Sequence, residues 1–256
     1  MELTKPFADH FSAIAAAYAA ARPTYPPALF AYLAELAPAR GRAWDCAAGN
    51  GQAALPLAEL FEEVVATDAS ASQLAQMPAH PRVRRYAGPA EASGLADASV
   101  DLVTVAQALH WLPLPAFWTE ARRVLRDGGV VAVWCYGIQR LDDPEMDPRL
   151  ESFYGSVVGP YWAPERRLVE TGYRTVEFPF AELPPPAFDM TLEWTLADLL
   201  AYVRTWSATN AFVRARGYDP VEALGIELAP HWGEGPRQVR WPLSVRVGRS
   251  RPGSTP

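Results

Sequence analysis

Lysine is almost absent from this sequence. Lys5 is the only lysine among 23 basic residues, while alanine and proline are abundant. This combination is typical of a compositional bias, so the excess of arginine indicates no function. The formal net charge of −6 argues against a surface that neutralises phosphates. We therefore expect no nucleic acid among the partners.

Cysteines and long hydrophobic runs are scarce as well. Neither the number nor the spacing of Cys46 and Cys135 predicts a disulfide framework or a zinc site, so we expect no metal and a cytoplasmic location. The alanine-rich run 13–21 follows Asp9 and His10 instead of a basic cluster, which argues against a signal peptide. No run reaches the length of a membrane span, so no membrane partner is expected.

Short apolar runs alternate with helical patterns between residues 43 and 136. Helical patterns lie at 52–62, 70–77 and 114–126, and an Asp-Gly-Gly sequence at 127–129 should cap the last of them. Strands that alternate with helices predict an α/β fold with a doubly wound, mostly parallel sheet and helices on both faces. The predicted strands are 43–46, 64–68, 83–87, 100–106 and 130–136.

The flanking segments predict further elements. Residues 7–37 read as two helices that a proline-rich stretch at 22–27 separates, and 138–150 and 179–189 read as loops. The remaining predictions are helices at 196–214 and 220–230 and a closing strand at 239–247.

This organisation predicts one domain over residues 1–250. Its core at 40–137 would bind the cofactor, and the segments 1–39 and 138–235 would form a lid or contact the substrate. Residues 251–256 are read as a tail.

A glycine turn follows the first predicted strand, in the sequence WDCAAGNGQA at 44–53. Gly49, Gly51 and Ala54 satisfy the pattern G-x-G-x-x-[G/A], and Asp68 follows at the spacing that nucleotide sites require. The same pattern also occurs in plain strand-to-helix turns. Asp45 would repel a pyrophosphate but attract an ammonium group. The single lysine cannot supply the tyrosine–lysine pair of short-chain dehydrogenases, and no phosphate-binding G-x-x-x-x-G-K-[S/T] loop is present.

A series of short motifs runs in order along nearly the whole chain. They are Phe11…Tyr18…Arg22-Pro23…Tyr25-Pro26, Asp45-x-Ala47-x-Gly49-Asn50-Gly51-Gln52, Thr67-Asp68-Ala69-Ser70, Ala90-Glu91, Asp101-Leu102-Val103…Gln107-Ala108-Leu109-His110-Trp111 and Val124-Leu125-Arg126-Asp127-Gly128-Gly129. With these motifs the chain resembles a class I S-adenosylmethionine-dependent methyltransferase, in the group of methyltransferase type 11 and trans-aconitate methyltransferase-like enzymes. The resemblance implies a Rossmann-like, mostly parallel seven-stranded sheet, N-terminal helices and a helical lid.

The resemblance also implies which residues bind S-adenosylmethionine. Asp45 would face the ammonium group, Asp68 would accept the ribose hydroxyls, and Arg22 would pair with the carboxylate. The alternative is a helix-end carbonyl contact for Arg22 and a core position for Tyr18. Ala47 replaces a more frequent glycine, which is tolerable if the backbone does not require a positive φ. The implied cofactor-binding residues are Tyr18, Arg22, Asp45, Ala47, Gly49, Gly51, Asp68, Ala69, Ala90, Glu91, Ala106 and Gln107.

The acceptor side is predicted more coarsely. His110 is the candidate catalytic base near the fourth strand, although it could instead pack on the next turn. A base is required only if the nucleophile must lose a proton. Later aromatic residues could line a lid or pack a core, and Trp111, Trp206 and Ser207 are the expected acceptor contacts. We expect methyl transfer to an oxygen, nitrogen or carboxyl nucleophile of a small molecule.

Two other classes of protein stay open. A nucleic-acid methyltransferase is disfavoured by the net charge and by the lack of an Asn-Pro-Pro-[Tyr/Phe] run after the fourth strand. The second alternative is a non-catalytic or nicotinamide-binding protein with the same kind of turn. The chain could be a monomer or a homodimer.

Overall fold

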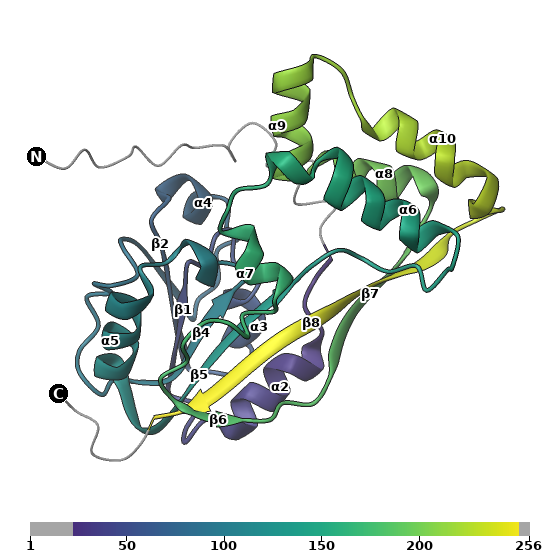
Figure 1. The fold of residues 1–256 in the computed structure, drawn as a ribbon. Coiled ribbons are helices and arrows are strands. Elements are labelled where there is room, and N and C mark those ends of the chain that lie inside the picture. Colours follow the sequence, from purple (N-terminus) through teal and green to yellow (C-terminus); the bar gives the residue numbers. More distant parts are fainter. Residues whose placement is uncertain (1–22, 251–256) are drawn as a thin grey trace, which may run out of the picture.

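The structure, a computed structural model, describes residues 23–250. Its sheet has the strand order β3-β2-β1-β4-β5-β8-β6, and β7 also pairs with β8 (Figure 1). The first five strands are parallel, and β6, β7 and β8 are antiparallel to their neighbours. The strands are β1 Arg42–Cys46, β2 Glu63–Asp68, β3 Val83–Ala87, β4 Val100–Ala106, β5 Leu125–Tyr136, β6 Ala181–Leu183, β7 Phe188–Trp194 and β8 Arg237–Arg249.

The predicted α/β fold with a mostly parallel sheet is confirmed, whereas the number of strands differs. The described part of the chain has eight strands, not seven. The extra strand arises because β6 and β7 pair with different stretches of β8, β6 near Arg249 and β7 between Arg237 and Leu243. The sheet is therefore seven strands wide, with its last position shared by two short strands.

Helices cover both faces of this sheet. α2 lies on one face and α5 on the other, and a second group of helices lies beyond the carboxyl end of β5 (Figure 1). The helices are α2 Pro27–Leu36, α3 Ala54–Ala58, α4 Ala71–Ala75, α5 Leu114–Val124, α6 Met146–Ser152, α7 Arg166–Glu170, α8 Leu196–Arg204, α9 Ser207–Arg216 and α10 Val221–Trp232, with short turns η1 Leu109–Trp111, η2 Phe153–Val157 and η3 Gly159–Tyr161. We call α6, η2, η3, α8, α9 and α10 the cap.

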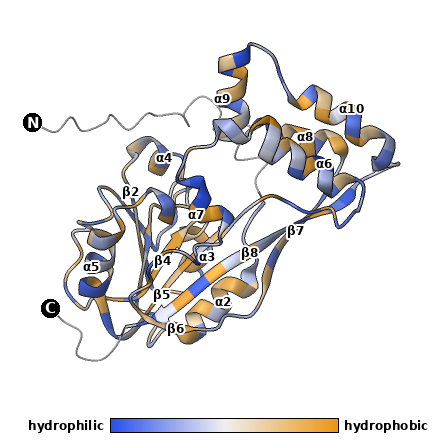
Figure 2. Cartoon of the chain, in the orientation of Figure 1, coloured by the Kyte–Doolittle hydropathy of each residue, from blue (hydrophilic) through white to orange (hydrophobic). Residues whose placement is uncertain are grey.

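Alternating residues of β5 supply two hydrophobic cores. Ala132 and Trp134 pack with α2, α3 and the cap, whereas Val133 and Cys135 pack with α5 and with residues around α7. Hydrophobic residues concentrate along the central strands, while β8 alternates between hydrophobic and hydrophilic residues (Figure 2). This difference is expected, because central parallel strands are covered on both faces and an outer strand is more exposed.

Several predicted elements need correction. The stretch at 179–189 is not a loop, because β6 lies within it and β7 begins there, and α6 begins inside the predicted loop 138–150. The predicted helix at 196–214 is two helices, α8 and α9. The Asp-Gly-Gly sequence at 127–129 lies in β5 and does not cap α5. Gly128 has a φ of 73°, and the register between β4 and β5 shifts nearby. Glycines within strands often mark such a bulge.

No helix within residues 23–250 combines the length and the apolar character that crossing a bilayer requires.

Candidate functional site

The turn after β1 requires an unusual backbone. Ala47, Gly49 and Gly51 have φ values of 55°, 55° and 92°. A side chain at Gly51 would also bring its Cβ to 2.5 Å from Cγ of Met77, so this position needs glycine on both counts. The condition under which alanine was acceptable at position 47 is therefore not met. Ala47 holds the left-handed conformation at a cost of roughly 1–2 kcal/mol.

Asp68 ties this turn to the end of β2. Its Oδ2 accepts a hydrogen bond from the backbone N–H of Gly49 at 2.8 Å, and its Oδ1 accepts one from Ser70 at 2.7 Å. Each carboxylate oxygen can accept a second hydrogen bond. Asp68 thus has a structural role that the sequence did not reveal, and it retains capacity for ligand hydroxyls. The neighbouring Ala69 is exposed.

Asp45 at the end of β1 is fully buried and only partly satisfied. Its Oδ1 accepts a hydrogen bond from the Thr104 hydroxyl at 2.8 Å, but its Oδ2 has no partner within the described residues. Burial raises the pKa of this carboxyl to about 7. The Thr104 hydroxyl and the backbone N–H of Ala54 oppose the rise, and the charge of Asp68 adds to it. A buried carboxylate with a free oxygen is costly unless a cation pairs with it. The predicted ammonium of the cofactor would fit this oxygen.

The ends of β3 and β4 complete this edge of the sheet. Ala90 is buried and Glu91 is exposed after β3. Gln107, which follows Ala106, has a φ of 54°, and its side chain both donates to the carbonyl of Tyr136 and accepts from its N–H. The Gln107 amide therefore joins β4 to β5 and is already engaged by the protein.

Two predicted cofactor residues, Tyr18 and Arg22, lie outside the described residues. Asp68 accepts a hydrogen bond from Gly49, and its charge acts on Asp45, so these predicted cofactor residues of the first two strands lie near one another. Within the described ranges, no group of three or more His, Cys, Asp and Glu side chains is placed to hold a metal ion.

His110 lies in η1, which begins three residues after the end of β4. Its side chain is largely buried, and its Nδ1 lies 3.0 Å from the hydroxyl of Tyr173. Its ring contacts that of Trp111 at a tilt of 46°, with the ring centroids 4.6 Å apart. Burial, aided by the positive charge of Arg166, lowers the pKa of His110 to about 4. His110 is therefore neutral at pH 7. Trp111 is 54% exposed and free to meet a ligand.

Trp206 belongs to an aromatic cluster inside the cap. Its ring contacts those of Phe153, Tyr154 and Trp162 at 6.3, 5.6 and 5.8 Å, and only 9% of the residue is exposed. Ser207 is exposed at the start of α9. Among the described residues, no ring contact or hydrogen bond joins Trp206 or Ser207 to Trp111, so these predicted acceptor residues do not form one cluster.

Arg166 connects the cap with the end of β4. Its Nε donates to the Tyr154 hydroxyl at 2.9 Å, and its guanidinium lies 4.7 Å above the Trp162 ring. The same charge lowers the pKa of His110. Arg166 was not singled out in the sequence, because an arginine in a short helix carries no signal of its own.

Two further residues were missed by sequence reasoning. Gln139, after β5, is 1% exposed, and neither its oxygen nor its nitrogen has a partner within the described residues. Tyr173 is fully buried against His110. No motif identifies either residue, because the burial of Gln139 and the contact of Tyr173 with His110, 63 residues away in sequence, arise only in the tertiary structure.

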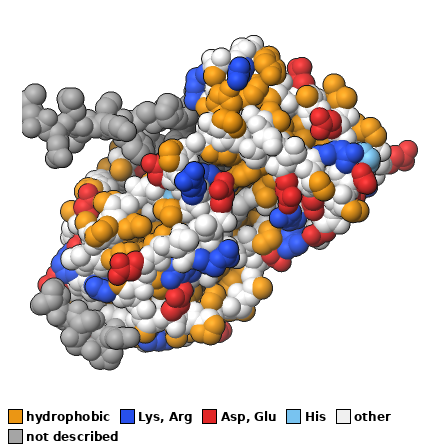
Figure 3. Space-filling model, viewed as in Figure 1, with side chains coloured by type: hydrophobic (Ala, Val, Ile, Leu, Met, Phe, Trp, Pro, Cys, Tyr) orange, Lys and Arg blue, Asp and Glu red, His pale blue; other side chains and the backbone are white. Residues whose placement is uncertain are grey.

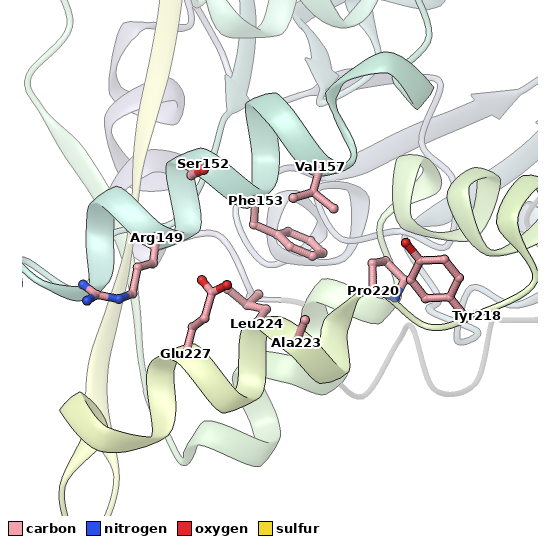
Figure 4. Close-up of a pocket in the computed structure, with 9 residues that line it drawn as sticks. All are labelled: Arg149, Ser152, Phe153, Val157, Tyr218, Pro220, Ala223, Leu224 and Glu227. Atoms are coloured by element: carbon pink, nitrogen blue, oxygen red, sulfur yellow. The ribbon is translucent and has the colours of Figure 1, made fainter.

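A pocket in the cap lies apart from these residues. It runs between α6 with η2 and the start of α10, and Phe153 forms part of its wall (Figure 4). None of the residues predicted to bind the cofactor or acceptor lines it. Its lining consists of Arg149, Ser152, Phe153, Val157, Tyr218, Pro220, Ala223, Leu224 and Glu227.

Comparisons with known proteins show the family of this chain. Residues 44–133 match the family model of a methyltransferase domain. A Dictyostelium discoideum protein named as a methyltransferase is 31% identical over 83% of this chain and 82% of its own length. An uncharacterized methyltransferase of Mycobacterium tuberculosis is 38% identical over 86% of each chain.

A solved structure shows the same relation in three dimensions. It comes from Anaeromyxobacter dehalogenans, is named as a type II methyltransferase, and is 47% identical with a TM-score of 0.85, covering 90% of this chain and 99% of that one. The two long sequence matches and this structure extend far beyond residues 44–133. The chain belongs to the class I S-adenosylmethionine-dependent methyltransferases.

Proposed function

We propose that this chain binds S-adenosylmethionine at the carboxyl ends of β1, β2 and β4 and methylates a small molecule beneath the cap. The buried, unpartnered Oδ2 of Asp45 beside the Asp68-anchored glycine turn is the observation that carries the cofactor part. Ligands of open α/β sheets bind beyond the strand ends where the strand order reverses, which here lies between β1 and β4.

The proposed roles follow from the hydrogen-bonding capacity and charge that each residue does not use within the protein. The Asp45 carboxylate would pair with the ammonium group, and the Asp68 oxygens would each accept one ribose hydroxyl. The turn Ala47–Gly51 would approach the ligand with its backbone, with Ala69, Ala90 and Glu91 beside the adenine and the backbone at Ala106 and Gln107 beside the amino acid end. When bound, S-adenosylmethionine supplies a methyl group on a sulfonium. The protein would align the acceptor and exclude water.

A small-molecule acceptor is favoured by the surface. On the face shown in Figure 3, arginines lie among aspartates and glutamates and form no continuous basic patch. This face therefore offers no continuous basic surface to a phosphate backbone. We place the acceptor between Trp111, exposed beside η1, and the cap residues Trp206 and Ser207. Closure of the cap would bring these groups together.

A pair of matched variants tests the cofactor site. Asp45→Asn keeps the shape but removes the charge, so the affinity for S-adenosylhomocysteine in calorimetry should fall by about tenfold or more, as expected for a hydrogen bond to a charged group. The control is Asp101→Asn, also fully buried, which pairs with Arg126 near the opposite end of β4. That variant should lose stability but keep its affinity. Equal affinities in all three proteins would refute the assignment of Asp45.

A further inference from the structure

The contact between His110 and Tyr173 joins η1 to the turn after α7, beside the hydrophobic core that Val133 and Cys135 form with α5. His110 projects from η1, and Tyr173 lies in the turn after α7, directly after Gly172. Both Gly172 and Tyr173 have a φ of 59°, a conformation that is uncommon for a bulky residue. The hydroxyl of Tyr173 and Nδ1 of His110 are 3.0 Å apart and buried. The direction of this hydrogen bond determines whether the other ring nitrogen, Nε2, carries a proton and donates or lacks one and accepts.

The surroundings of the Tyr173 oxygen indicate that it donates. The backbone N–H groups of Leu109 and His110, at the start of η1, approach this oxygen and oppose the effect of burial on its pKa. Burial raises the pKa of Tyr173 well above its usual value, so the hydroxyl keeps its proton. Within the described residues, the hydrogen bond of this buried hydroxyl is to Nδ1 of His110, so Nδ1 is the acceptor for its proton. If Nδ1 of His110 carried a proton and donated it instead, the buried hydroxyl proton of Tyr173 would have no acceptor.

The groups around His110 also keep the ring neutral. Arg166 is the charged group that acts on it from α7, Cys135 of β5 has a pKa raised to about 12 by burial, and Trp111 is uncharged. No carboxylate is among the groups that shift the pKa of His110. A neutral ring that accepts at Nδ1 carries its single proton on Nε2. Within the described residues, Nε2 has no hydrogen-bond partner.

We propose that Tyr173 is a positioning residue that fixes His110 as the Nε2–H tautomer, so that His110 offers the methyl acceptor a hydrogen-bond donor and not a base. This inference rests on the proposed function. An Nε2–H donor at His110 favours acceptors whose nucleophile is already ionised and accepts hydrogen bonds, as a carboxylate does. The acceptor oxygen then bonds to the methyl carbon as the carbon–sulfur bond breaks, the electron pair stays on sulfur, and no proton moves.

Nitrogen NMR of the full chain tests the tautomer without any ligand. Long-range proton–nitrogen correlations separate the two neutral tautomers and the imidazolium, and the spectrum of His110→Gln identifies the His110 signals. At neutral pH the wild type should show the Nε2–H tautomer. Tyr173→Phe should mix the tautomers, whereas the control Tyr218→Phe, an exposed tyrosine in the cap, should not. An Nδ1–H tautomer in the wild type, or a spectrum unchanged by Tyr173→Phe, would overturn the proposal.

Methyl transfer from labelled S-adenosylmethionine tests the donor role. The assay uses carboxylic acids, phenols and amines as candidate acceptors. The amide nitrogen of glutamine reaches the position of Nε2, so His110→Gln should keep kcat within about fivefold of wild type, while His110→Asn should lose tenfold or more. Equal losses in both variants, or no loss in either, would overturn the donor role. If no acceptor turns over and S-adenosylhomocysteine does not bind, the proposed function fails, and the NMR result still decides the tautomer.

Discussion

Asp45 holds an ionisable group that the protein has removed from water. Its raised pKa of about 7 compares with 3.8 for an aspartate in water, so the folded chain binds more protons than the unfolded chain between about pH 4 and pH 7. The free energy of unfolding should therefore fall as the pH rises through this window. Asp45→Asn should reduce that fall. Denaturant titrations of both proteins at several pH values measure the difference, and parallel curves would contradict the burial argument.

Cofactor binding should release the same proton. An ammonium group beside Asp45 favours the carboxylate, so at about pH 6 the binding of S-adenosylhomocysteine should expel protons, and its affinity should rise toward pH 8. Calorimetry in two buffers with different enthalpies of ionisation counts the protons. A proton count that Asp45→Asn leaves unchanged would place the ammonium elsewhere.

We expect Asp68 both to bind the ligand and to stabilise the turn after β1. Asp68→Ala removes hydrogen bonds to a charged group, each worth roughly 1.5–3 kcal/mol, and should weaken S-adenosylhomocysteine binding at least about tenfold. It also frees the N–H groups of Gly49 and Ser70. Thermal unfolding should therefore show a lower midpoint as well. The exposed Asp97 provides the control, since Asp97→Ala should leave the affinity unchanged.

The positions of the strand-end acids could be predicted from the sequence, because a charged residue at the end of an apolar run must lie at the edge of a sheet. Their hydrogen bonds could not. The side chain of Gln107 is used within the protein, and Tyr173 approaches His110 from a distant turn. Both contacts depend on tertiary packing. The expectation that His110 acts as a base was drawn from its usual pKa, which burial changes.

At the scale of elements, the turn from β1 to α3 contains avoidable strain. Ala47→Gly relieves roughly 1–2 kcal/mol of left-handed strain and adds roughly 0.5–1 kcal/mol of chain entropy to the unfolded state. The variant should gain up to about 1 kcal/mol of stability in denaturant titrations, with its cofactor affinity preserved because φ stays the same. Exposed Ala98 has a φ of 46° and gives the control. A gain at Ala98→Gly alone would mean that position 47 is held by contacts that require the methyl group.

The apolar runs predicted β1 to β4 to within one residue, and β3 and β4 have the predicted bounds, whereas β5 begins five residues before the predicted start at 130. The wrongly predicted elements are those whose structure depends on hydrogen bonding to a distant strand or on the start of β5. β6 and β7 are edge strands in a proline-rich stretch, and their partner β8 lies far along the chain. The glycines at 127–129 carry the signal of a helix cap, yet they lie in β5, because the strand begins directly where α5 ends.

At the scale of the whole molecule, the cap is joined to the sheet through aromatic packing. Tyr202 contacts both Trp206 of the cap and Trp241 of β8, at 6.1 and 5.5 Å. We expect cofactor binding to add hydrogen-exchange protection at the turn 45–51 and also in the cap and around residues 18–25, which lie mostly outside the described part. Protection confined to residues 45–70 would show that the cap does not close on the ligand.

The most direct test of the account is a calorimetric titration of the wild-type chain with S-adenosylhomocysteine and with NAD under identical conditions. The unpartnered Oδ2 of the Asp45 carboxyl favours a ligand with an ammonium group and disfavours a pyrophosphate. The account predicts saturable binding of S-adenosylhomocysteine at one site per chain and no binding of NAD. Binding of NAD without binding of S-adenosylhomocysteine would contradict it.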